Sequence, residues 1–245
     1  MTQNIFDQVA GDYEKIHNQC LPPGVQSESF ITQRAAHTVQ WILSQSGDGE
    51  FSYLDFGCGN GRMLKCLLES DGLRPFLDTG RLRLSGFDTS ADSLQEARTL
   101  LNSSPVTLAD KWSEFPRDIR FDLMVSCHVF HHIPLKERAK TARALYQRLK
   151  PKGRLVIWEQ NPLNPFTRLL VKTCPFDREA QLLTAAATRR LFSQNSFRLL
   201  ESAYINLLPP QWLKNERLAA IEKRLLSFPV GTQYWMMFQR GLRMG

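Results

Sequence analysis

The sequence contains no run of about 18 apolar residues, the length that a membrane-spanning helix needs. Its first four residues also lack the basic and apolar regions of a secretion signal, so we expect a cytoplasmic protein. The five cysteines are odd in number and include no Cys-x-x-Cys pair, which favours reduced thiols over a disulfide framework. Internal repeats and low-complexity tracts are absent, which excludes repeat architectures.

Acidic residues are scarce in the last third of the chain. Residues 161–245 contain 5 Asp and Glu against 12 Lys and Arg, whereas residues 1–160 contain 19 of each, so the net charge of +7 lies wholly in the last third. The imbalance indicates an anionic partner, either a phosphorylated substrate or an acidic membrane surface. A solvated basic surface is the alternative.

Strands alternate with helices along most of the 245 residues. This order predicts an α/β fold, a doubly wound and mostly parallel Rossmann-like sheet of seven strands. Within one structural domain we expect a helical cap at 1–46, a nucleotide-binding core at 47–160, and a part at 161–245 that completes the sheet and adds a helix on the substrate side. The predicted strands are 51–56, 81–87, 105–109, 121–127, 154–159, 197–207 and 233–239.

The first predicted strand runs into a glycine-rich turn, Asp55-Phe56-Gly57-Cys58-Gly59-Asn60-Gly61. Glycines there let the backbone turn tightly and approach a ligand, while the following helix points free N–H groups at that ligand. A dinucleotide fingerprint needs its third glycine three residues after the second, and position 62 is Arg. The spacing therefore favours a different nucleotide-like cofactor.

Acidic and histidine side chains follow the neighbouring strands. Asp88, after the second strand, has two carboxylate oxygens that could accept both hydroxyls of a ribose; capping of the next helix is the alternative. After the fourth strand, His128 or His131 could act as general base toward a substrate hydroxyl, and His132 could brace the loop. No carboxylate accompanies these histidines in the sequence, which disfavours a metal site.

These motifs together resemble class I S-adenosylmethionine-dependent methyltransferases of the small-molecule type, and the His-His-Ile-Pro segment at 131–134 is a specific part of that resemblance. The resemblance implies S-adenosylmethionine as cofactor, with Asp55 near its methionine end and Asp110 near its adenine amino group. The N-terminal Phe-Asp-x-x-Ala-x-x-Tyr pattern is similar to the first helix of quinone-type members, in which the Tyr approaches the cofactor. The residues expected to bind the cofactor are Tyr13, Asp55, Gly57, Cys58, Gly59, Gly61, Asp88, Thr89, Asp110, Lys111, Trp112 and Cys127.

The segment after the fifth strand contains Asn-Pro-Leu-Asn-Pro at 161–165 and resembles a bacterial subgroup whose members often accompany glycan, lipid or secondary-metabolite pathways. A rigid proline-rich crossover is the alternative. Arg168 and Arg178 are candidates for binding a substrate phosphate or carboxylate. Residues 210–228 predict an amphipathic helix that caps the substrate pocket, packs against the domain, or lies on a bilayer.

The sequence therefore predicts methyl transfer from S-adenosylmethionine to a small molecule or to an acceptor linked to a lipid or glycan. The expected methylated atom is a hydroxyl oxygen. The acceptor could be anionic and the protein could touch a membrane surface. Asn-Pro-Pro-Tyr, a segment used in DNA and protein methylation, is absent, as is an aromatic and basic RNA-binding platform, so a nucleic-acid partner is disfavoured. RNA methylation and an inactive cofactor-binding protein are the alternatives.

Overall fold

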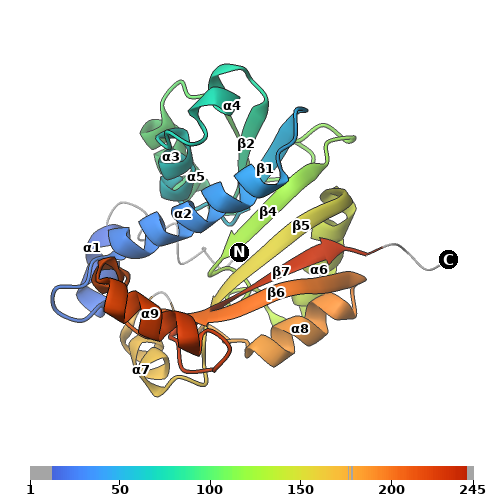
Figure 1. Ribbon diagram of the computed structural model, residues 1–245. Coiled ribbons are helices and arrows are strands. Elements are labelled where there is room, and N and C mark those ends of the chain that lie inside the picture. Colours follow the sequence, from blue (N-terminus) through green and yellow to red (C-terminus); the bar gives the residue numbers. More distant parts are fainter. Residues whose placement is uncertain (1–12, 176, 178, 242–245) are drawn as a thin grey trace.

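The computed structural model describes residues 13–175, 177 and 179–241, and these form a seven-stranded sheet with helices on both faces (Figure 1). The strand order is β3-β2-β1-β4-β5-β7-β6. Strands β1 to β5 pair in parallel, and β7 runs antiparallel to both β5 and β6. The predicted fold class is confirmed. The strands are β1 (Phe51–Phe56), β2 (Leu82–Phe87), β3 (Val106–Ala109), β4 (Phe121–Cys127), β5 (Leu149–Gln160), β6 (Phe197–Ile205) and β7 (Gln233–Arg240).

Each face of the sheet carries its own hydrophobic core because side chains alternate along a strand. In β5, Leu155 and Ile157 belong to the core beneath α6 and α8, whereas Val156 and Trp158 belong to the core beneath α2, α3 and α5. All four side chains have no exposed surface. The helices are α1 (Tyr13–Cys20), α2 (Ser27–Gln45), α3 (Arg62–Leu68), α4 (Arg74–Asp78), α5 (Ala91–Leu101), α6 (Leu135–Arg148), α7 (Pro165–Thr173), α8 (Ala185–Ser193) and α9 (Glu216–Leu225), with a 3-10 helix η2 (Pro210–Lys214).

Helix α7 occupies the proline-rich segment that the sequence left without a helix. Asn164 caps it, because its Oδ1 accepts the N–H groups of Phe166 and Thr167 at 2.9 and 3.2 Å, and Pro165 fills the first helical position. A cap of the same kind divides the helix predicted over 210–228. Asn215 accepts the N–H groups of Arg217 and Leu218, so that α9 starts afresh after η2. None of the described helices is long and apolar enough to cross a membrane.

Candidate active site

The glycine turn after β1 adopts the left-handed backbone that only glycine takes readily, with φ of +80°, +50° and +80° at Gly57, Gly59 and Gly61. A Cβ on Gly57 would lie 2.2 Å from Cγ2 of Val129, so the turn packs tightly against the loop after β4. A Cβ on Gly59 would meet nothing within 4 Å, because Gly59 borders an open cavity. Gly61 instead packs toward Ala97 of α5.

Asp88 links the glycine turn to the start of α5. Its Oδ2 accepts the N–H of Gly59 at 2.8 Å, and its Oδ1 accepts the N–H of Ser90 at 2.9 Å. Each carboxylate oxygen can accept more than one hydrogen bond, so both remain able to meet a diol. The two roles that the sequence suggests for Asp88, ribose binding and support of the helix start, are therefore compatible, because Asp88 contacts the start of α5 and also faces the cavity.

A single cavity of about 770 Å³ lies over the carboxyl ends of the parallel strands. That is the edge where ligands bind in open α/β sheets. Among the residues predicted from the sequence, ten line it: Asp55, Gly57, Cys58, Gly59, Asp88, Thr89, Trp112, Cys127, His128 and His131. Gly61, Asp110, Lys111 and Arg168 are not among its lining residues. The side chain of Tyr13 and all of Arg178 lie outside the described residues.

Asp110, Lys111 and Arg168 lie away from the cavity lining. Asp110 lies 3.6 Å from Nζ of Lys111, whose side chain is exposed, and the backbone N–H of Asp110 donates to Glu114. Arg168 is exposed on α7, although Thr167 and Leu170 of the same helix reach the cavity. The structure therefore does not support Arg168 as a substrate clamp, because its side of the helix faces solvent.

Trp112 lines the cavity and stacks on Phe87 with ring centroids 4.6 Å apart.

Asp55 lies buried at the end of β1 beside a cation that the sequence analysis missed. Burial, and secondly the negative charge of Asp88, raise the pKa of Asp55 from 3.8 to about 7, while Arg34 of α2 opposes the shift. Arg34 also lines the cavity. It stands in a helix of ordinary amphipathic pattern, and no motif in the sequence distinguishes it.

We expect Asp55 to contribute a loss of stability in the ligand-free protein as the pH rises from about 4 to 7. In this window the folded state keeps a proton on Asp55 that the unfolded chain has released, and the Asp55 contribution to the free energy of unfolding therefore decreases with pH. Urea unfolding of the wild-type protein and of Asp55→Asn at pH 5 and pH 8 isolates this contribution. The free energy of unfolding of the wild type should change less favourably between the two pH values than that of the variant; an equal change in both proteins would contradict the assignment.

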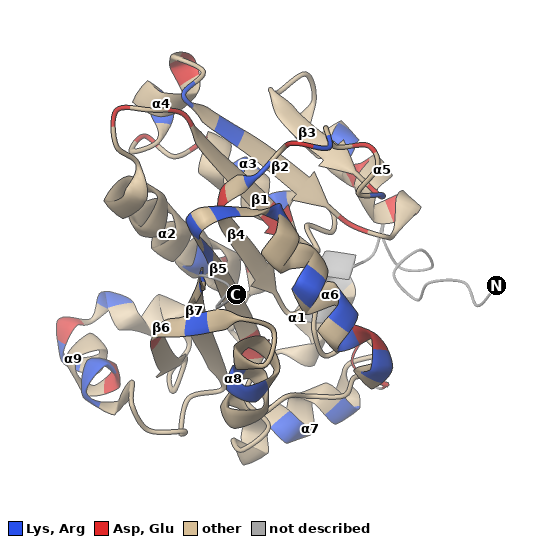
Figure 2. Cartoon of the chain, turned by 90° about the vertical axis from the view of Figure 1, so that its right-hand side faces the viewer, with Lys and Arg blue, Asp and Glu red and all other residues tan. Residues whose placement is uncertain are grey.

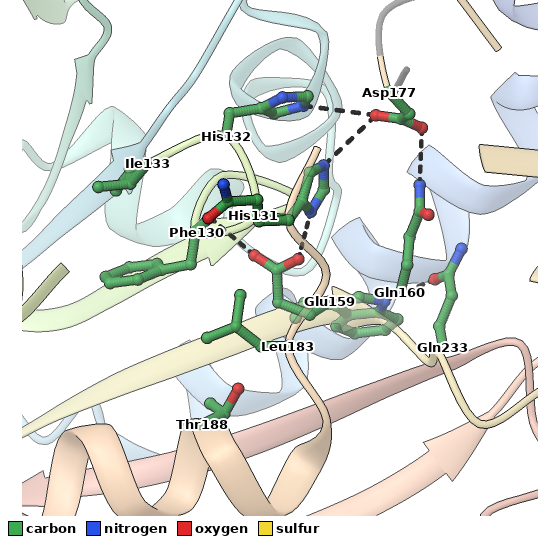
Figure 3. A network of polar contacts seen from close by, with 12 residues as sticks. Phe130, His131, His132, Ile133, Glu159, Gln160, Asp177, Leu183, Thr188 and Gln233 are labelled. Atoms are coloured by element: carbon green, nitrogen blue, oxygen red, sulfur yellow. Dashed lines mark hydrogen bonds and ion pairs between the residues drawn. The ribbon is translucent and has the colours of Figure 1, made fainter. Parts of the chain in front are cut away.

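The histidine segment lies on the loop between β4 and α6. His128 takes a left-handed backbone, φ +57°, and its N–H donates to the carbonyl of Trp158 at 2.8 Å. His131 is buried, and its Nδ1 lies 2.5 Å from Oε2 of Glu159 (Figure 3). The other oxygen of Glu159 accepts the N–H of Phe130 at 2.8 Å, so this carboxylate holds the loop by two contacts.

Asp177, from the segment between α7 and α8, completes the network. Its Oδ1 lies 3.4 Å from Nε2 of His131 and 3.4 Å from Nε2 of His132, and its Oδ2 accepts a hydrogen bond from Gln160 at 3.0 Å. In the sequence the histidines have no carboxylate beside them, but the fold brings them two, Glu159 from β5 and Asp177 from the segment between α7 and α8. The lack of a neighbouring carboxylate in the sequence is therefore no argument against a metal site.

Charge is distributed unequally over this network. Burial would lower the pKa of His131, but Glu159 and Asp177 outweigh it and raise the pKa to about 9. Burial, and then the charge of His131, lower the pKa of His132 to about 3. Burial would raise the pKa of Asp177, but its contacts with His131 lower it to about 2. A pKa of about 9 means that His131 holds its proton at neutral pH, which makes it a poor general base. His128 remains the predicted base.

Comparison with known proteins agrees with the resemblance to methyltransferases seen in the sequence. Residues 54–155 match the family described as "Methyltransferase domain". The central part of the chain is therefore similar to a methyltransferase domain. A ubiquinone biosynthesis O-methyltransferase from Colwellia psychrerythraea is 28% identical over 155 residues, and the match covers 60% of this chain and 58% of that relative. The chain therefore matches little more than half the length of this curated relative.

Solved methyltransferase structures share the fold of this chain at low sequence identity. A S-adenosylmethionine-dependent methyltransferase from Archaeoglobus fulgidus superposes with a TM-score of 0.61 at 14% identity, covering 87% of this chain and 95% of that one. The N-methyltransferase NodS from Bradyrhizobium japonicum, solved with S-adenosylhomocysteine, gives 0.55 at 16% identity, covering 85% and 87%. The domain match and the fold support the predicted cofactor, S-adenosylmethionine. They do not identify the subgroup with the Asn-Pro-x-Asn-Pro segment.

Proposed function

We propose that this protein is a methyltransferase and transfers the methyl group of S-adenosylmethionine to a hydroxyl oxygen of a small acceptor, free or linked to a lipid or glycan. The observation that carries the proposal is one cavity that brings together the glycine turn, Asp88 and His128. Its volume, about 770 Å³, lies within the range of roughly 300–1,000 Å³ that small-molecule and cofactor sites occupy. The name of the Colwellia relative, an O-methyltransferase, favours oxygen as the methylated atom.

The residues present fit the cofactor. Gly59 leaves open space beside the turn, Asp88 offers two acceptor oxygens for the ribose hydroxyls, and the indole of Trp112 offers a surface beside the adenine. At the other end, Arg34 and Asp55 pair naturally with the carboxylate and the ammonium of the methionine part. A nearby ammonium favours the ionised form of Asp55. When bound, the cofactor supplies a methyl group on a positively charged sulfur.

His128 is the group that we assign to the acceptor proton. It lines the cavity from the loop after β4, next to Cys127. The Cys127 thiol stays protonated, because burial raises its pKa to about 12, so it does not compete as a base. The acceptor hydroxyl loses its proton to the imidazole as its oxygen attacks the methyl carbon. Holding the two reactants in line and excluding water then accounts for most of the acceleration.

The distribution of positive charge favours a small acceptor over RNA. The Lys and Arg residues after position 160 that the structure describes lie on six different elements, α7, α8, β6, η2, α9 and β7, and not along one helix or strand (Figure 2). An RNA-binding surface needs such residues gathered along one face or groove. The bound acceptor can still be anionic.

We also propose peripheral contact with a membrane, for which α7 offers exposed Phe166 and Leu169 beside Arg168 and Lys172.

A His128→Ala variant tests the proposed base. With a panel of phenolic, quinol and saccharide hydroxyl acceptors, formation of S-adenosylhomocysteine measures turnover. We expect kcat to fall by about 10²-fold or more while the affinity for the cofactor changes little, because general-base catalysis contributes roughly 10²–10⁴-fold. His37→Gln is the matched control, since His37 packs among Trp41, Trp158 and Trp235 and is not among the lining residues. Unchanged turnover in His128→Ala would remove the assignment.

A further inference from the structure

Two histidines and one aspartate converge at the wall of the cavity. Figure 3 shows the rings of His131 and His132 directed at the carboxylate of Asp177. The two Nε2 atoms lie 3.4 Å from the same oxygen, Oδ1, and the three candidate ligand atoms lie within 4.8 Å of one another. All three residues line the cavity. Nothing in the cofactor-binding role uses this cluster.

The separations of the candidate ligand atoms fit a metal site. Good N–H···O hydrogen bonds measure about 2.7–3.2 Å, and both Nε2 to Oδ1 distances exceed that range. In a tetrahedral site with ligand bonds of about 2.0–2.1 Å, neighbouring ligand atoms stand about 3.4 Å apart. The two observed distances, each 3.4 Å, equal that edge.

The surrounding contacts also have the form of a metal site. A ligating histidine usually donates its other ring N–H to a carboxylate, which fixes the tautomer and the ring. Glu159 accepts from Nδ1 of His131 in this way, leaving Nε2 directed at Asp177. Gln160 donates to Oδ2 of Asp177, which leaves Oδ1 for the two histidines. Glu159 and Gln160 end the same strand, β5, so one rigid element orients two of the three ligands.

We propose that Nε2 of His131, Nε2 of His132 and Oδ1 of Asp177 bind a zinc-type divalent cation. Two imidazole nitrogens and a carboxylate leave a fourth position open, as in catalytic zinc sites. On binding, His131 gives its Nε2 proton to solvent and donates the freed electron pair to the metal. The open position would take the hydroxyl oxygen of the acceptor; that role rests on the proposed function, whereas the site itself does not.

A second grouping, His128, His131 and Glu159, fits the geometry less well. Both oxygens of Glu159 already accept hydrogen bonds, one from the backbone of Phe130 and one from His131. A metal there would compete with these existing contacts of Glu159. The two groupings predict opposite results for two substitutions, Asp177→Asn and His128→Ala, and this difference makes the proposal testable.

The test is calorimetric titration of zinc, and spectroscopic titration of cobalt(II), into the full-length protein after chelator treatment. We expect one site, proton release on binding, affinity that falls as the pH is lowered, and the visible absorption of tetrahedral cobalt. Asp177→Asn and His132→Ala should abolish the site, and Glu159→Gln should weaken it by about 10–100-fold. His128→Ala is the matched control and should keep it.

Absence of zinc binding by the wild-type protein would overturn the proposal, as would loss of binding in His128→Ala with retention in Asp177→Asn. Circular dichroism on every variant shows whether it is folded, and His132→Ala tests the site independently of Asp177. Titration of S-adenosylhomocysteine into the same chelator-treated samples keeps the proposals apart. Cofactor binding without metal binding refutes only the metal site, and metal binding without methyl transfer refutes only the proposed reaction.

Discussion

Glu159→Ala should destabilise the protein by about 3–5 kcal/mol, the cost of removing one partner from a buried ion pair. The side chain of Glu159 has no exposed surface. Its loss leaves the N–H of Phe130 without its acceptor and His131 with only Asp177 to balance its charge. Urea unfolding at pH 7 with a chelator present measures the change without any contribution from bound metal.

The matched control for this prediction is Glu201→Ala. Glu201 lies on β6 with its side chain exposed, so we expect its removal to change the free energy of unfolding by less than about 0.5 kcal/mol. Glu159→Gln keeps a hydrogen-bond acceptor and the size of the side chain. Its loss of free energy of unfolding should therefore lie between those of Glu159→Ala and Glu201→Ala. A Glu159→Ala variant as stable as Glu201→Ala would show that this carboxylate does not hold the loop.

Asp88→Ala should raise the dissociation constant for S-adenosylmethionine by about 100-fold or more. Two hydrogen bonds from ribose hydroxyls to a charged carboxylate are worth roughly 1.5–3 kcal/mol each. The same substitution also removes the acceptor of the Gly59 N–H and loosens the glycine turn. Calorimetric titration of the cofactor into the wild-type protein and the variant gives the ratio directly.

Asp110→Ala is the control for Asp88→Ala. Both aspartates follow adjacent parallel strands, β2 and β3, but only Asp88 lines the cavity. We therefore expect Asp110→Ala to bind the cofactor within about threefold of the wild type, a change below 1 kcal/mol. A large loss in Asp110→Ala would restore the adenine contact implied by the family resemblance, and an unchanged affinity in Asp88→Ala would refute the ribose contact.

The cofactor half of the site was predictable because local sequence determines it. Gly57 and Gly59 mark a turn with positive φ, and Asp88 follows a strand, so a rule about strand ends placed all three at one edge. The same rule, applied to the fifth strand, would have found Glu159. The alternation of core residues in β5 was likewise readable from its sequence.

The network around His131 was not predictable in the same way. Asp177 joins it from a segment with no strand, glycine motif or helical period, and only tertiary packing brings it to His132. Arg34 lies on a helix that the sequence marks as ordinary. Asn164 and Asn215 show a different failure, because side-chain caps at these two positions start helices α7 and α9 where the proline content and the long amphipathic pattern suggested otherwise.

The most direct test of the central claim, that this cavity binds S-adenosylmethionine, is calorimetric titration of S-adenosylhomocysteine into the purified wild-type protein. We predict saturable binding of one molecule per chain with a dissociation constant in the micromolar range. If no binding of either S-adenosylhomocysteine or S-adenosylmethionine is detected, the methyltransferase fold has lost its cofactor and the proposed reaction fails with it.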